Sequence, residues 1–131
     1  MGRFLVSSNS PLEKPIGFSR AVRSGPWVAV SGTAPINIDG SNAYIGDVYG
    51  QTKKCIHIIE EALAKAGCTL SQVIRTRIML KDNARWEEAA KAHGEFFSDI
   101  RPACTFVEVK GFIKPEWLVE VEADALIGNL E

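Results

Sequence analysis

The sequence lacks several features that mark whole classes of protein. It has no excess of basic residues, because 15 Lys and Arg stand against 16 Asp and Glu, for a formal net charge of −1. Nucleic-acid binders need a positive surface against phosphates, so we expect no nucleic-acid partner. No apolar run approaches the roughly 18 residues of a membrane span, so we expect no membrane association. Internal repeats and low-complexity tracts are also absent.

Cysteine and histidine are too few and too scattered to form a framework. The three cysteines, Cys55, Cys68 and Cys104, are odd in number and lack disulfide spacing. The first ten residues carry no signal-peptide pattern, so we expect a reducing, cytoplasmic location. His57 and Cys55 are two residues apart, on different faces of a helix, and no other pair has metal-ligand spacing. No phosphate-loop or dinucleotide fingerprint is present. We therefore expect no metal and no cofactor.

The length and the patterning indicate one folded domain over residues 1–131. Its hydrophobic content of 46% suffices for a core. Periodicity, caps and turn residues predict seven elements. They are a hairpin of strands 18–23 and 27–31, a helix over 48–66, a strand over 73–80, a helix over 85–97, and strands over 105–109 and 118–126. The order ββαβαββ predicts an α+β fold in which one mixed sheet has two helices on one face.

Strict alternation along the predicted strands separates an apolar face of the sheet from a charged one. We expect the apolar face, with Ile74, Thr76, Ile78 and Leu80, to receive the helices. We assign to the charged face Val73, Arg75, Arg77, Met79, Cys104, Phe106, Glu108, Glu120, Glu122 and Asp124. Such a face is either solvated or lies in a subunit interface, where buried charges are tolerated when they are paired.

Four stretches of the sequence resemble one known family. "GFSRAV…SGTAP", "QTKKCIHIIEEALAKAGCTLSQVIRTRIMLKD", "HGEFF" and "RPACTFVEV…LVEVEADA" are similar to the RidA/YjgF family, also called the Rid or endoribonuclease L-PSP family. The resemblance covers nearly the whole chain, from Gly17 to Ala125. It implies a chorismate-mutase-like fold and a homotrimer whose sheets form a central barrel, with small-molecule clefts between subunits.

The resemblance also implies a chemistry and a set of site residues. In the RidA type, the cleft hydrolyses enamines and imines such as 2-aminoacrylate to a 2-keto acid and ammonia. The glutamate that positions the attacking water corresponds to Glu120. The arginine that grips the substrate carboxylate falls on Cys104, and the family's helix asparagine falls on Ala90. The expected substrate-binding residues are Phe18, Ser31, Gly32, Arg101, Cys104 and Phe106.

The replacement of the family arginine by Cys104 leaves the activity open. A thiol cannot imitate a bidentate guanidinium–carboxylate pair. One hypothesis is a Rid-like hydrolase or deaminase of a small reactive imine or enamine, with water oriented by Glu120. The other is a non-catalytic trimer that binds small molecules or protein partners, in which Glu120 pairs with Arg75 or Arg77. The charge balance argues against an endoribonuclease.

Overall fold

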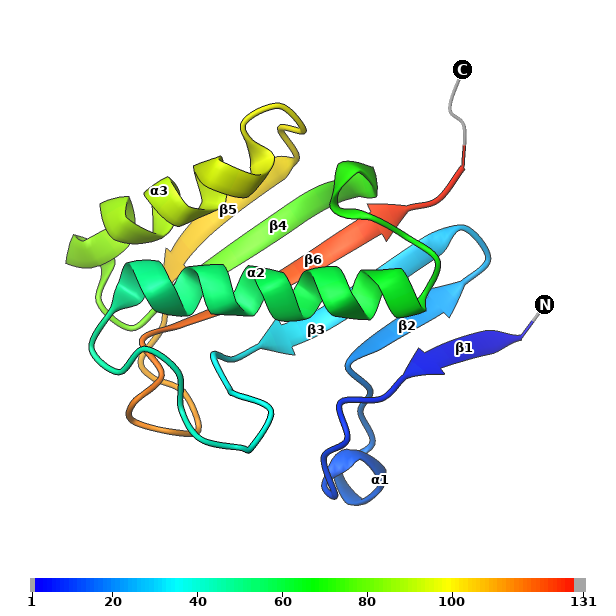
Figure 1. Ribbon diagram of the computed structural model, residues 1–131, viewed down its shortest axis with the longest axis horizontal. Coiled ribbons are helices and arrows are strands. Elements are labelled where there is room, and N and C mark those ends of the chain that lie inside the picture. Colours follow the sequence, from blue (N-terminus) through cyan, green and yellow to red (C-terminus); the bar gives the residue numbers. More distant parts are fainter. Residues whose placement is uncertain (1, 129–131) are drawn as a thin grey trace.

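The chain folds into one six-stranded mixed sheet covered by two main helices. The structure is a computed structural model that describes residues 2–128. The strands are β1 (Arg3–Val6), β2 (Ala21–Ser24), β3 (Trp27–Thr33), β4 (Val73–Leu80), β5 (Ala103–Glu108) and β6 (Val119–Leu126). The helices are α1 (Glu13–Ile16), α2 (Val48–Lys65) and α3 (Trp86–Phe97), with the short 3₁₀ helices η1 (Leu70–Gln72) and η2 (Asn83–Arg85). The strand order is β1-β2-β3-β6-β4-β5, and only the β4–β5 pair is parallel (Figure 1).

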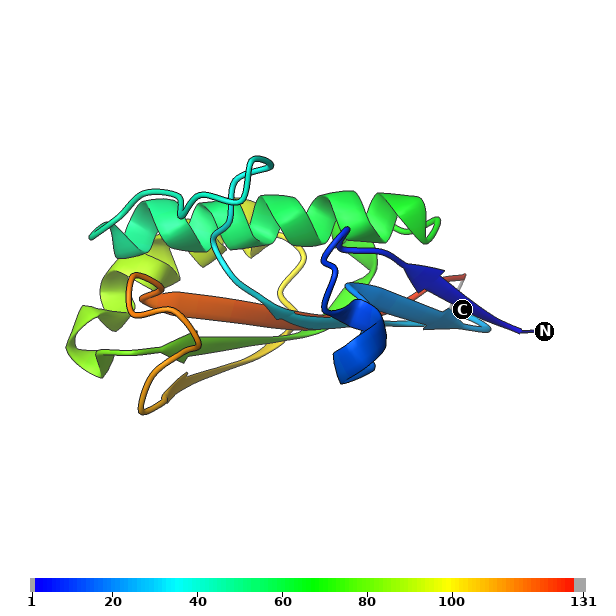
Figure 2. The same ribbon diagram turned by 90° about the horizontal axis from the view of Figure 1, so that it is seen from below.

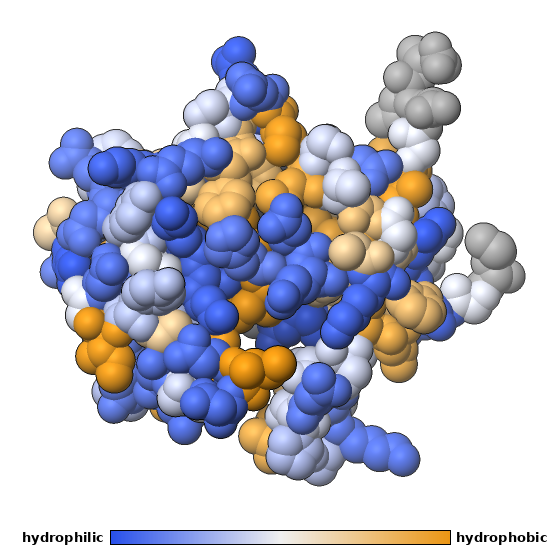
Figure 3. All heavy atoms as spheres, viewed as in Figure 1, coloured by the Kyte–Doolittle hydropathy of each residue, from blue (hydrophilic) through white to orange (hydrophobic). Residues whose placement is uncertain are grey.

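Helices α2 and α3 lie on one face of the sheet, and the short α1 lies on the other side (Figure 2). Asp47 caps α2 by accepting a hydrogen bond from the Gly50 amide at 2.9 Å. Ile56, Ile59 and Leu63 then fall at helical spacing and are buried against the sheet. Hydrophilic residues predominate on the outer surface of α2 (Figure 3). No helix within residues 2–128 has the length and apolarity to cross a bilayer.

The predicted α+β architecture, with two helices on one face of a mixed sheet, is confirmed. The predicted strand over residues 73–80 matches β4, and helix α3 begins one residue later than predicted. The order ββαβαββ was incomplete, because it lacked β1 and α1. Strand β1 has only four residues, three of them exposed, so its sequence carries no alternating pattern that would predict a strand. It forms one edge of the sheet by pairing with β2.

A register shift at the start of β4 corrects the predicted faces there. Val73 pairs with Ala125 and Arg75 with Asp124, so the strand carries an irregularity between them. Val73 is consequently buried in the core, whereas Ile74 is 40% exposed. Their predicted faces were wrong, because a bulge interrupts the period of two. From Thr76 onward the alternation holds, with Thr76, Ile78 and Leu80 buried.

The start of β6 is held by a buried glutamine on α2. The Gln51 amide nitrogen donates to the carbonyls of Ala43 at 3.3 Å and Glu116 at 3.0 Å. Its oxygen accepts a hydrogen bond from the Leu118 amide at 2.8 Å. A fully buried amide needs such partners, since an unsatisfied one costs about 1–3 kcal/mol. Gln51 thereby fixes the backbone two residues before Glu120.

Candidate functional site

The face of the sheet opposite α2 and α3, here called the open face, carries the predicted charges of β4 and β6. Arg77 forms an ion pair with Glu122, and the Nε of Arg75 lies 3.8 Å from an oxygen of Asp124. The expectation that both signs of charge pair on this face is confirmed for these strands. Within one chain each arginine has another carboxylate as its partner, so a pairing of Glu120 with Arg75 or Arg77 in the barrel stays a prediction.

Glu120 lies partly buried on the open face, against the backbone of β3. The register of β3 with β6 shifts between Val30 and Thr33, and Gly32 lies in this irregular stretch. A methyl group at Gly32 would come within 2.9 Å of the Glu120 Oε1. Burial raises the pKa of Glu120 above its ordinary value; the positive charge of Arg20 opposes this shift, and the negative charge of Glu122 adds to it. The result is a carboxylate whose pKa is displaced toward neutrality.

Arg20 is the neighbour of Glu120 that sequence reasoning missed. Its Nη1 donates hydrogen bonds to Ser31 Oγ at 3.2 Å, to the Gly32 carbonyl at 3.1 Å and to Thr33 Oγ1 at 3.0 Å. The Ser31 amide in turn donates to the Arg20 carbonyl at 3.0 Å. Although Arg20 lies within the quoted stretch "GFSRAV", it lies just before β2, where no residue pattern identifies a facing partner. Its link to β3 appears only once the hairpin is folded.

Phe18 lines a hollow beside this cluster. The hollow lies between the N-terminal segment and β2, and its lining includes Leu5, Pro11 and Val22. Glu13 also lines it, and its carboxylate is occupied by hydrogen bonds from Ser7 and Ser8. The structure thus brings Ser31, Gly32 and Glu120 together around Arg20, and it holds Phe18 at the neighbouring hollow.

The other predicted substrate-binding residues lie on the helix-covered side. In the parallel β4–β5 pair, Cys104 is in register with Thr76 and Phe106 with Ile78. Because residues in register share a face, Cys104 and Phe106 point toward α3 rather than toward the open face. The ring of Phe106 packs edge-on against Trp86, with centroids 6.0 Å apart. Their predicted position beside Glu120 on one face was wrong.

Glu108, Arg101 and the exposed thiol of Cys104 complete the description of this segment. Glu108, also predicted on the charged face, is in register with Leu80 and accepts a hydrogen bond from the Asn83 amide at 2.7 Å. Arg101, which ends the turn after α3, is exposed and has a φ of 56°, a left-handed conformation that costs a non-glycine residue about 1–2 kcal/mol. Cys104, at the edge of the sheet, is exposed.

His93 joins α3 to the sheet beneath it. Its Nε2 lies 2.9 Å from Thr76 Oγ1, and its ring packs on Phe97 with centroids 4.6 Å apart. Burial lowers the pKa of His93. This histidine therefore packs within the fold, as its position on the helix stripe indicated.

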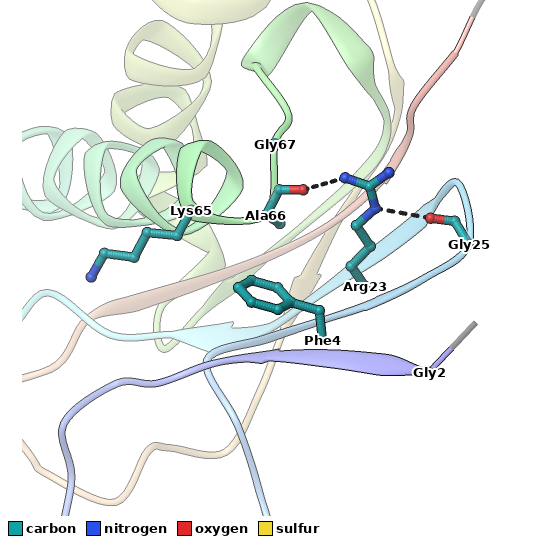
Figure 4. A pocket seen from close by; sticks show the side chains of 7 residues that line it. All are labelled: Gly2, Phe4, Arg23, Gly25, Lys65, Ala66 and Gly67. Carbon is teal, nitrogen blue, oxygen red and sulfur yellow. Dashed lines mark hydrogen bonds between the residues drawn. The ribbon is translucent and has the colours of Figure 1, made fainter.

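A second hollow lies near the end of α2 (Figure 4). Arg23 and Phe4 line it, but the Arg23 guanidinium is committed to the backbone. Its Nη1 donates to the Ala66 carbonyl at 2.8 Å, and its Nε donates to the Gly25 carbonyl at 2.9 Å. A cation at the carbonyl end of a helix is stabilising, so Arg23 serves as a cap for α2.

Comparison with known proteins identifies the group to which this architecture belongs. Residues 9–127 match the sequence model of a family described as endoribonuclease L-PSP. The chain is 39% identical to the uncharacterized protein SCO2049 of Streptomyces coelicolor, over 96% of this chain and 93% of that protein. It is 31% identical to the 3-aminoacrylate deaminase RutC of Acinetobacter baylyi, over 80% of this chain and 82% of that protein.

A solved structure shares the fold throughout. The crystal structure of Rv2704 from Mycobacterium tuberculosis, a member of the YjgF/YER057c/UK114 family, superposes with a TM-score of 0.86. The two sequences are 44% identical, and the match covers 96% of this chain and all of the other. The expected chorismate-mutase-like fold is thereby confirmed. The chain belongs to the endoribonuclease L-PSP family, also known as the RidA/YjgF family.

Proposed function

We propose that the protein is a hydrolase that deaminates a small reactive imine or enamine, with Glu120 orienting the attacking water. The observation that carries this proposal is the state of Glu120. Its carboxylate is partly buried, lies against Gly32 and has no arginine of β4 as an ion-pair partner. A carboxylate with a raised pKa can accept a proton from water near neutral pH. The similarity to a 3-aminoacrylate deaminase supports the same reaction class.

The proposed reaction needs one proton acceptor and one water molecule. An enamine first tautomerises to the imine by gaining a proton on carbon and losing one from nitrogen. Glu120 then accepts a proton from water as the water oxygen bonds to the imine carbon and the C=N double bond becomes single. The nitrogen takes up two protons, one from Glu120 and one from the new hydroxyl group, and leaves as ammonia while the C=O double bond forms. The net change is imine plus water to carbonyl compound plus ammonia.

We propose that the site is completed by another copy of the chain. Glu120 and Gly32 lie on the open face, whereas Cys104 and Phe106 face α3 on the other side of the same sheet. A small molecule cannot contact both groups within a single chain. The inter-subunit clefts of a homotrimer would bring them together, with Phe18, Ser31 and Gly32 on one side and Arg101, Cys104 and Phe106 on the other. Light scattering tests this assembly: a mass near three times 14.3 kDa is expected, and a monomer would contradict it.

The activity itself is tested with imines generated in place. An amino-acid oxidase supplies imino acids, and semicarbazide traps those that are not hydrolysed first. The wild type should lower the yield of trapped product. Glu120→Gln should lose about 100-fold to 10,000-fold of the rate, the range for a general base. If the two proteins are indistinguishable across several amino acids, the deaminase proposal is wrong.

A non-catalytic trimer that binds metabolites or protein partners is the second candidate, and Cys104 is the observation in its favour. If the family arginine is the only missing part, Cys104→Arg should raise the activity, by about tenfold or more. No gain from a folded variant would mean that the site differs from the family's in more than this one residue. An endoribonuclease remains the weaker alternative, because the net charge of −1 supplies no field for a phosphate backbone.

A further inference from the structure

Cys104 stands at the position where the family has a substrate-binding arginine. Another positively charged side chain is therefore needed to pair with the carboxylate of a ligand. Two arginines are candidates near the residues of the proposed site. Arg101 is exposed, and within the part of the chain that the structure describes its side chain has no hydrogen-bond or ion-pair partner that would orient it. Arg20 is partly buried and is oriented by three acceptors on β3. A pre-oriented group loses less entropy on binding, which favours Arg20.

Gly32 relates Arg20 to Glu120 in space. The Arg20 Nη1 lies 3.1 Å from the Gly32 carbonyl oxygen, and the Glu120 Oε1 lies 2.9 Å from the point where a Gly32 side chain would begin. Both charged groups therefore contact the same residue of β3. They still form no direct ion pair, because the two side chains do not approach within the 4.0 Å of such a contact.

The guanidinium of Arg20 retains donors for a ligand. All three of its hydrogen bonds use Nη1. Within residues 2–128, its Nε and Nη2 have no acceptor, and no buried side-chain nitrogen or oxygen is left without a partner. Those two nitrogens are therefore not fully buried. A guanidinium edge with two free N–H groups matches a carboxylate in the bidentate geometry.

We propose that Arg20 is the carboxylate-binding residue of this protein, replacing the arginine that is absent at Cys104. This inference rests on the proposed function for the identity of the site. The ligand class is a small 2-oxo or 2-imino carboxylate, whose carboxylate bonds to Nε and Nη2 of Arg20. Glu120, which lies against the same glycine as Arg20, is the group proposed to hold the water. Phe18, two residues before Arg20, lines the neighbouring hollow.

Binding of pyruvate, measured by isothermal titration and by NMR line broadening, tests the proposal without any turnover. The wild type should bind pyruvate, and the uncharged pyruvamide should bind at least tenfold more weakly. Arg20→Gln should weaken pyruvate binding by about tenfold to a hundredfold, the range for a hydrogen-bonded charge pair. Arg20→Lys keeps the charge without the fork and should lie between the two. The matched control, Arg75→Gln on the open face, should bind as the wild type does, and Arg101→Gln tests the competing arginine.

The outcomes separate this inference from the proposed function. The inference is wrong if Arg101→Gln weakens pyruvate binding and Arg20→Gln does not. It is also wrong if the wild type binds pyruvamide as tightly as pyruvate, or if it binds neither compound. Because Arg20 also holds Ser31, Gly32 and Thr33, its glutamine variant could unfold; Arg20→Lys and the pyruvamide comparison then decide. Arg20-dependent binding without imine hydrolysis would defeat only the proposed function. Hydrolysis that Arg20→Lys and Arg20→Gln leave unchanged would defeat only the inference.

Discussion

Replacing Gly32 by alanine tests the geometry of the site with a single methyl group. The added carbon would lie 2.9 Å from the Glu120 Oε1, whereas ordinary van der Waals contact begins at 3.4 Å. The carboxylate must therefore retreat by about 0.5 Å, which is the tolerance within which catalytic groups have to be held. Since a 1 Å displacement costs about a hundredfold in rate, Gly32→Ala should slow imine hydrolysis by about tenfold to a hundredfold.

The same substitution should leave the fold intact. Gly32 does not have a positive φ, so alanine fits its backbone. Removing glycine restricts the unfolded chain, which stabilises a protein by about 0.4–1 kcal/mol where the native conformation is compatible. Urea unfolding should thus give an unchanged or slightly higher free energy of unfolding, while the semicarbazide assay reports the lost rate.

A matched control is available in Gly111. A methyl group there would meet nothing within 4 Å, and its φ is not positive. Gly111→Ala should therefore retain both the rate and the stability. The reasoning is refuted if Gly32→Ala hydrolyses imines as fast as the wild type, or if its rate loss merely follows a loss of folded protein.

Other predictions follow from the buried titratable groups. Because burial raises the pKa of Glu120, the ionised form of this side chain opposes folding. The free energy of unfolding of Glu120→Gln should therefore increase relative to that of the wild type as pH rises toward 8. A difference between the two proteins that stays constant from pH 4 to 8 would contradict this. His93 has a pKa lowered by burial, so the free energy of unfolding should fall as pH drops below 6.5, and His93→Gln should flatten that slope in urea titrations. Of the three thiols, Cys104 is exposed and Cys55 and Cys68 are buried, so native protein should react rapidly with a disulfide reagent at one site, and Cys104→Ser should remove that phase. Rapid reaction of all three in native protein would show that the core opens.

The sequence was most informative where alternation and caps were uninterrupted. The period of two along β6 assigned Val119 and Glu120 to opposite faces, as observed, because no bulge interrupts that part of the strand. On β4 the same rule failed at Val73 and Ile74, since a register shift is set by the neighbouring strand and leaves no mark in the local pattern.

The error on β5 had a different cause. The carboxylate of Glu108 suggested that its face joins the other charges, yet Glu108 lies at the edge of the sheet, where it accepts a hydrogen bond from the Asn83 amide. Parallel pairing with β4 then fixes Cys104 and Phe106 on the helix side. Similarly, the role of Arg20 depends on contacts with β3, eleven to thirteen residues away. Pair contacts of this kind are properties of the folded sheet rather than of any local stretch.

The separation of Glu120 and Cys104 onto opposite sides of one sheet has an evolutionary consequence. Substitutions at the exposed residues of β5 disturb little of the core, so that this half of the proposed pocket is free to diversify. Glu120 lies against Gly32, where even an added methyl group would meet its carboxylate. Under the proposed function, lineages with this architecture can thus exchange what they recognise while retaining the carboxylate that orients water.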